Sequence, residues 1–150
     1  MVDWSNQPIL IVEDSPEDFE ATVRALHKSG LRNTLFRCSD GEDALDFLHR
    51  RGEYVAPDSA PRPGLILLDL NLPGTDGREV LEEIKQDPSL KKIPVVVLTT
   101  STDERDIEAC YEFGANSYIH KPVDLAGLVD AIQRLKDYWF QIVVFPKTDS

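Results

Sequence analysis

Polar side chains follow four short apolar runs of this 150-residue chain, at the point where each run ends. Asp69 follows the run 65–68, which is apolar throughout and therefore predicts a strand buried on both faces of a parallel sheet. The carboxyl ends of parallel strands meet along one edge of the sheet, where ligands bind in this class of fold. We therefore expect that edge to collect the polar residues of all four runs: Glu13, Asp14, Asp69, Thr99 and Lys121.

The three carboxylates of this set predict a site for a metal ion. Packed carboxylates repel one another unless a cation lies between them. Oxygen ligands suit Mg²⁺, which takes a few carboxylates and keeps several of its waters. Glu13 and Asp14 alone are as typical of a helix cap, but Asp69 and Lys121 at the same edge favour the metal. Asn71 lies two residues after Asp69, so its backbone carbonyl can turn back toward the ion.

Beside such an ion, the Asp69 carboxylate is a nucleophile toward phosphorus and would form an aspartyl phosphate. The Lys121 ammonium and the Thr99 hydroxyl would offset the charge of the transferred group. A phosphatase of the haloacid-dehalogenase type also uses an aspartyl nucleophile, but it needs a second acid two residues later, where this chain has Asn71. The sequence contains no GxxxxGK[ST] or GxGxxG run, so we do not expect a nucleotide site.

Strand-like and helix-like patterns alternate along the chain and predict an α/β fold. Right-handed crossovers would build one doubly wound parallel sheet with helices on both faces. The predicted strands are 9–12, 34–37, 65–69, 94–98 and 116–119. The predicted helices are 16–29, 43–50, 77–86, 102–113 and one that Asp124 caps, with apolar positions through 135.

Two segments depart from this alternation. Residues 51–63 contain three prolines and predict a surface loop, long for a compact domain and therefore either functional or disordered. Residues 138–145 add seven large apolar side chains after the last predicted helix. They would pack along the domain's own flank or form a dimer interface, where aromatic residues are enriched, and we favour the dimer.

The charge balance excludes some partners. The chain has 16 Lys and Arg against 27 Asp and Glu, a net charge of −11, which argues against binding to nucleic acid or to an anionic membrane. No signal peptide, long apolar run or lipidation motif is recognisable, so we expect a cytoplasmic protein. Cys38 and Cys110 lack metal-ligand spacing and are expected to be buried, reduced thiols.

Over about residues 7–138 the chain resembles the receiver domain of two-component response regulators. Asp69 precedes Thr99 by 30 residues, and Thr99 precedes Lys121 by 22, as in chemotaxis-type receivers. The acidic pair, the run from Asn71 to Gly77 and the Lys121-Pro122 dipeptide also match. The resemblance implies a flavodoxin-like (βα)5 domain with strand order 2-1-3-4-5.

The same resemblance implies roles for the residues of the site. Asp69 would accept a phosphoryl group from a sensor histidine kinase, and Thr99 and Lys121 would bind the phosphoryl oxygens. Mg²⁺ would be held by Glu13, Asp14, Asp69 and the main chain of Asn71. Tyr118 falls at the family's switch aromatic, which moves with Thr99 and changes the surface of the fourth helix, fifth strand and fifth helix.

The long loop, the Leu98–Ser101 sequence and the aromatic tail most resemble response regulators of cyanobacterial and bacterial phytochromes. This implies a light-regulated histidine kinase as partner and a homodimer. Residues 1–150 are interpreted as one stand-alone receiver domain with an apolar extension at 139–150 and no output domain, hence not an enzyme.

Two other functions remain open for this chain. In addition, two of its positions differ from the residues usual in the family. The chain could be a phosphorelay intermediate that passes phosphate to a histidine phosphotransfer protein, or a small Mg²⁺-dependent phosphatase, which would need turnover on free substrate. Glu13 replaces the commoner Asp, and Thr100 stands where the family usually has Ala or Gly.

Overall fold

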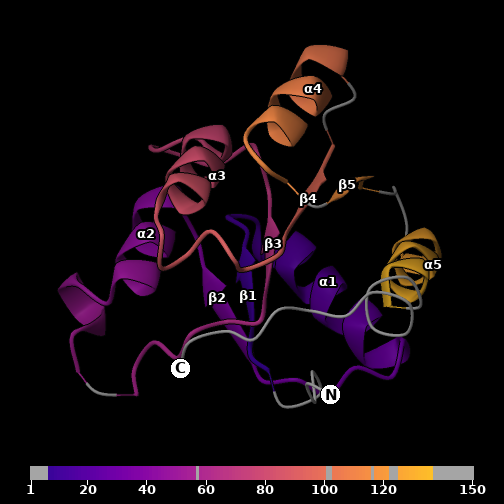
Figure 1. Ribbon diagram of the computed structural model, residues 1–150. Helices are drawn as coiled ribbons and strands as arrows, with labels where there is room; N and C mark the ends of the chain where they lie inside the picture. The colour runs from indigo at the N-terminus through magenta and orange to yellow at the C-terminus, as the bar shows by residue number, and fades with distance from the viewer. Residues whose placement is uncertain (1–6, 57, 101–102, 116, 122–124, 137–150) are drawn as a thin grey trace.

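A five-stranded parallel sheet forms the centre of the computed structural model, which describes residues 7–56, 58–100, 103–115, 117–121 and 125–136 (Figure 1). The strand order is β2-β1-β3-β4-β5, so the predicted flavodoxin-like topology is confirmed. All residues of β1 and β3 are buried, as the apolar sequences of these two central strands require. The strands are β1 (Ile9–Val12), β2 (Leu35–Cys38), β3 (Leu65–Leu68), β4 (Val95–Thr99) and β5 (Ser117–His120).

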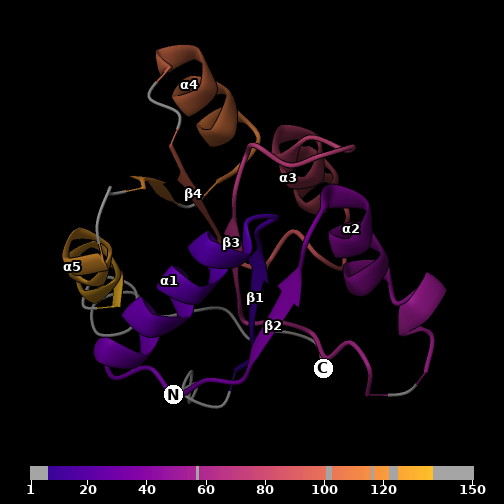
Figure 2. The ribbon, with the colours of Figure 1, turned by 180° about the vertical axis from the view of Figure 1, so that it is seen from behind.

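Helices cover both faces of the sheet (Figures 1 and 2). Helices α1 and α5 lie side by side, and Leu26 and Ile132 bury their side chains in the same apolar cluster. Helices α2, α3 and α4 contribute Leu45, Ile84 and Cys110 to a second cluster, which also contains Leu68 of β3. The helices are α1 (Pro16–Lys28), α2 (Gly41–His49), α3 (Gly77–Gln86), α4 (Glu104–Glu112) and α5 (Leu125–Lys136).

Side-chain caps fix where these helices begin. Ser15 Oγ accepts a hydrogen bond from the Asp18 backbone N–H at 3.2 Å, and Pro16 occupies the first turn, as the sequence predicts. Asp40 caps α2 by accepting from the Asp43 N–H at 2.7 Å. Because of this cap, α2 begins at Gly41, two residues earlier than predicted. The predicted cap of α5, Asp124, lies outside the described residues.

The segment 51–63 is more ordered than the predicted surface loop, so that prediction is wrong in part. It contains the short 3-10 helix η2 (Gly52–Tyr54). The Tyr54 ring packs edge-on against Phe47 at 5.1 Å between centroids, and its hydroxyl donates to Asp43 Oδ1 at 2.7 Å. Further along, Ala60 is buried and its carbonyl accepts from Arg50 Nε at 3.0 Å. The segment is therefore held against α2 before residue 57 and against the C-cap of α2, Arg50, after it.

Cys38 and Cys110 are buried free thiols, as predicted. Among the described residues, no helix combines the length and the apolar character needed to cross a bilayer. Residues 137–150 lie outside the described residues, so the apolar extension, the dimer and the single-domain organisation stay predictions.

Candidate functional site

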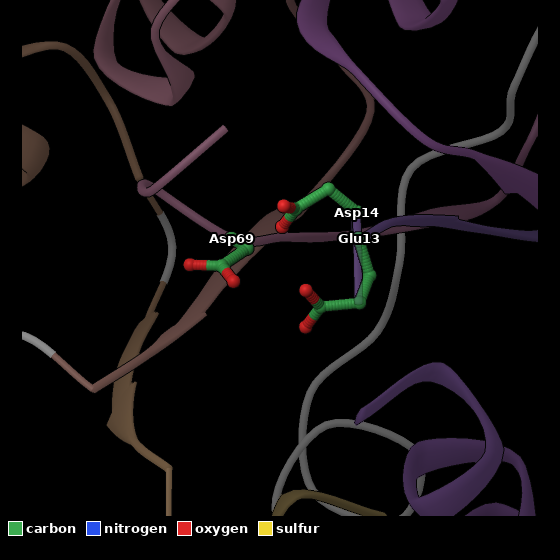
Figure 3. Close-up of side chains that lie close together, drawn as sticks. All are labelled: Glu13, Asp14 and Asp69. Carbon is green, nitrogen blue, oxygen red and sulfur yellow. The ribbon is translucent and has the colours of Figure 1, made fainter. Parts of the chain in front are cut away.

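Three carboxylates meet beyond the ends of the two central strands. Glu13 and Asp14 follow β1, and Asp69 follows β3. The register that pairs Val12 with Leu68 places the next residues of both strands side by side. The Asp69 N–H donates to the Val12 carbonyl at 3.1 Å, which continues the ladder by one step. One oxygen from each carboxylate lies within 4.8 Å of the others, and Figure 3 shows the Glu13 and Asp14 carboxylates turned to the side where Asp69 lies.

Burial makes this cluster electrostatically costly. Glu13 and Asp69 are 3% and 7% exposed, whereas Asp14 is exposed to solvent. Burial, together with the Asp69 charge, raises the pKa of Glu13 to about 7, although a hydrogen bond from Lys121 opposes the shift. A hard cation would relieve the repulsion, and carboxylate oxygens are the ligands that Mg²⁺ prefers. The donor set therefore fits the predicted ion.

Lys121 brings a positive charge to the same space. It follows β5, and its backbone N–H donates to the Thr99 carbonyl at 2.7 Å, which sets the side chain at the edge of the sheet. Its ammonium Nζ lies 3.0 Å from Asp69 Oδ2 and also pairs with Glu13. Burial alone would lower the pKa of Lys121, but the hydrogen bonds to Glu13 and Asp69 raise it above its usual value. The amine therefore stays protonated.

Asn71 and Thr99 complete the edge. Thr99 ends β4 and has no exposed surface. Its hydroxyl lies 3.4 Å from Asn71 Nδ2, and the Asn71 backbone N–H donates to Asp69 Oδ1 at 3.1 Å. Gly77 permits this turn, since a Cβ there would lie 2.4 Å from the Asp69 carbonyl oxygen. The predicted residues Glu13, Asp14, Asp69, Asn71, Thr99 and Lys121 are thus gathered at one place.

Tyr118 lies on β5, three residues before Lys121, and pairs in register with Val97 of β4. Its side chain is half-buried and packs against the apolar cluster beneath α2, α3 and α4. It is therefore next to the strand that ends in Thr99, as a switch residue would have to be.

Sequence reasoning missed two residues that contact the site. Asp18 Oδ2 lies 3.0 Å from Lys121 Nζ, but the sequence presented Asp18 only as one of the acids in the first turn of α1. Arg37 donates from Nε to the Glu13 carbonyl at 3.2 Å and from Nη2 to the Asp14 carbonyl at 3.3 Å. The one available signal for Arg37 was a basic residue inside an otherwise apolar strand.

The family model described as the response regulator receiver domain matches residues 9–133, which span all five strands. The chain belongs to this family. Its receiver domain is therefore a module of two-component signalling.

Several known receivers are similar to this one over nearly their whole length. It is 48% identical to the response regulator Rcp1 of Synechocystis sp. over 148 residues, 97% of this chain and 99% of Rcp1. The phosphorylated cyanobacterial phytochrome response regulator RcpA superposes with a TM-score of 0.86 at 42% identity, covering 95% of this chain and 99% of RcpA. The Mn²⁺-bound form of Rcp1 superposes with a TM-score of 0.84 at 47% sequence identity, covering 94% of this chain and 99% of Rcp1. The predicted likeness to phytochrome response regulators is confirmed.

Proposed function

We propose that this receiver domain accepts a phosphoryl group on Asp69 from a sensor histidine kinase and that the transfer depends on Mg²⁺. The observation that carries the proposal is the placement of Asp69 Oδ2 3.0 Å from the Lys121 ammonium, inside a cluster of three carboxylates. This buried carboxylate has a fixed cation on one side and potential metal ligands on the other. It is therefore suited to attack phosphorus.

The transfer exchanges one bond for another. An Asp69 carboxylate oxygen bonds to phosphorus, the phosphorus–nitrogen bond of the phosphohistidine breaks, and its electron pair stays with the imidazole. Lys121 would donate to a phosphoryl oxygen, and the Thr99 hydroxyl would move from its contact with Asn71 to do the same. Glu13, Asp14, Asp69 and the main chain of Asn71 would hold Mg²⁺, which supplies positive charge against the phosphoryl oxygens.

We propose acceptance rather than phosphatase turnover because of Asn71. A hydrolase of the aspartyl type would need an acid at this position, and the Asn71 side chain instead lies near Thr99 while its backbone N–H binds Asp69. At neutral pH an amide neither donates a proton to a leaving group nor accepts one from water. Position 71 therefore supplies no acid–base group for turnover on a free substrate.

The output would be a change of surface at α4, β5 and α5. Thr99 and Tyr118 lie on adjacent strands, and Tyr118 is only half-buried, so a shift of Thr99 toward the phosphoryl group would open room for the aromatic ring to move inward. New contacts at the phosphoryl group would bias such a two-state surface.

The kinase partner proposed is of the phytochrome type, because RcpA is a phytochrome response regulator and this chain is similar to it throughout. The test mixes an autophosphorylated, radiolabelled phytochrome kinase with the wild-type chain and with Asp69→Asn. Label should leave the kinase and appear on the wild type alone. Label on both proteins, or on neither while RcpA accepts it from the same kinase, would contradict the proposal.

We further propose that residues 1–150 act in the cytoplasm as one receiver domain and that residues 138–145 join two copies of it. The support is the density of apolar side chains in that segment. Truncation after Asp137 should convert a dimer to a monomer in sedimentation velocity. An unchanged profile would reject the tail as the dimer interface.

A further inference from the structure

Lys121 has a third carboxylate partner, and it comes from a different part of the fold. Asp18 lies in the first turn of α1, and its Oδ2 is 3.0 Å from Lys121 Nζ. The pair joins α1 to the residue that follows β5, more than a hundred positions along the chain. Asp18 is not one of the three carboxylates that form the metal-type cluster. Its contact with the site is therefore made through the lysine.

The backbone of Asp18 is well fixed. Its N–H donates to Ser15 Oγ at 3.2 Å, and its carbonyl accepts from Thr22 Oγ1 at 2.9 Å. Both contacts lie within α1 and its N-cap, and α1 packs against α5 through buried side chains. Asp18 therefore presents its carboxylate to Lys121 from a rigid helix rather than from a loop.

The three partners of Lys121 differ in what the proposed reaction asks of them. Glu13 and Asp69 would bind the metal ion, and Asp69 would also take the phosphoryl group. Of the three, only Asp18 would neither bind the metal ion nor accept the phosphoryl group. Its side chain is 50% exposed, against 4% for Glu13 and 8% for Asp69, so it stands at the outer side of the ammonium.

We propose that Asp18 is a positioning residue that holds the Lys121 ammonium against the acceptor oxygen while the two inner carboxylates are engaged. An ammonium has three N–H donors, so a bond to Asp18 leaves two for Asp69 and a phosphoryl oxygen. The lysine stem is flexible, and a fixed outer partner removes the freedom that would otherwise let the charge swing away. This inference rests on the proposed function.

Glu17 gives a matched control from the same turn of α1. Its carboxylate lies 3.2 Å from Ser15 Oγ and has the same favourable position at the helix N-terminus as Asp18. Glu17→Gln therefore removes one negative charge from the same turn without touching the lysine contact. An effect of Asp18 on helix stability or on overall charge would appear in both variants.

The experiment follows the rate of phosphorylation by acetyl phosphate at saturating Mg²⁺, by intact mass, for the wild type, Asp18→Asn, Asp18→Glu and Glu17→Gln. Asp18→Asn should lower the maximal rate about tenfold, since partners that orient a reacting group typically cost this much. The acetyl phosphate concentration at half-maximal rate should stay the same. Asp18→Glu should recover part of the rate, and Glu17→Gln should stay within about twofold of wild type.

The inference is overturned if Asp18→Asn and Glu17→Gln slow labelling equally, or if the loss in Asp18→Asn follows a fall in melting temperature that Asp18→Glu shares. Failure of the proposed function looks different. In that case Asp69→Asn, included as a further control, gains a phosphoryl group as fast as the wild type.

Discussion

The guanidinium of Arg78 in α3 grips the carboxylate of Asp106 in α4, with Nε 2.8 Å from Oδ1 and Nη2 2.6 Å from Oδ2. The same guanidinium reaches Asp76, the N-cap of α3, from Nη1 at 2.9 Å. Asp76 belongs to the turn that begins at Asp69. Arg78 therefore ties α4, part of the proposed output surface, to the turn that carries the acceptor.

Arg78→Met should lower the free energy of unfolding by about 1 kcal/mol, because a two-pronged charge-assisted pair that is partly buried is lost. Urea unfolding of Arg78→Met, Asp106→Asn and the double variant measures the coupling, for which we expect about 1 kcal/mol as well. Arg105 is the control, since it makes a similar pair with Asp103, the N-cap of α4, but its side chain is exposed to solvent. Arg105→Met should change stability by less than about 0.5 kcal/mol. Additive effects of Arg78 and Asp106 would refute the link.

Tyr54 should hold the segment 51–63 on α2. Tyr54→Phe loses the hydrogen bond to Asp43 and should cost about 1 kcal/mol in urea unfolding. Tyr54→Ala also loses the packing on Phe47 and should cost about 2 kcal/mol. Val55, next in sequence and 71% exposed, is the control, and Val55→Ala should be neutral. Equal stabilities of Tyr54→Ala and Val55→Ala would mean that the segment is not anchored there.

Glu13 makes metal binding depend on pH. Burial raises its pKa to about 7, so the folded metal-free protein holds this proton more tightly than the unfolded chain. Its contribution to stability is thus complete below the ordinary glutamate pKa of 4.5 and is lost as pH rises through about 7. Since the deprotonated form is the ligand, Mg²⁺ affinity measured by calorimetry should increase from pH 6 to pH 8. In Glu13→Gln the affinity should be lower and nearly independent of pH across this range. A flat profile in the wild type would contradict the pKa assigned to Glu13.

The sequence predicted the five strands and five α-helices of the described fold because these elements are strongly patterned and most are bounded by Pro, Gly or a capping residue; it did not predict the 3-10 helix η2. The errors lie at element ends and in segment 51–63. Helix α2 begins at Gly41 rather than at residue 43, because Asp40 caps it through a side-chain contact that the apolar pattern does not reveal. The anchoring role of Tyr54 was not predicted, because the surrounding Pro and Gly residues indicate a loop. Its contacts with Asp43 and Phe47 depend on the tertiary fold.

In the candidate site, too, some residues could be predicted from the sequence and others could not. Glu13, Asp14, Asp69, Thr99 and Lys121 could be predicted because all five stand at strand ends, and strand ends in a parallel sheet share one edge. Asp18 and Arg37 could not, because an acid in the first turn of a helix and a base in an edge strand each have an ordinary local explanation. Only the tertiary fold brings the first turn of α1 next to Lys121, more than a hundred positions along the chain.

The most direct test of the central claim, that Asp69 is a metal-dependent phosphoryl acceptor, is the intact mass of the protein after incubation with acetyl phosphate and Mg²⁺. Wild type and Asp69→Asn are compared, each with and without EDTA. We predict a gain of one phosphoryl group on the wild type, absent with EDTA and absent in Asp69→Asn. An equal gain in Asp69→Asn, or a gain in the wild type that EDTA leaves untouched, would contradict it.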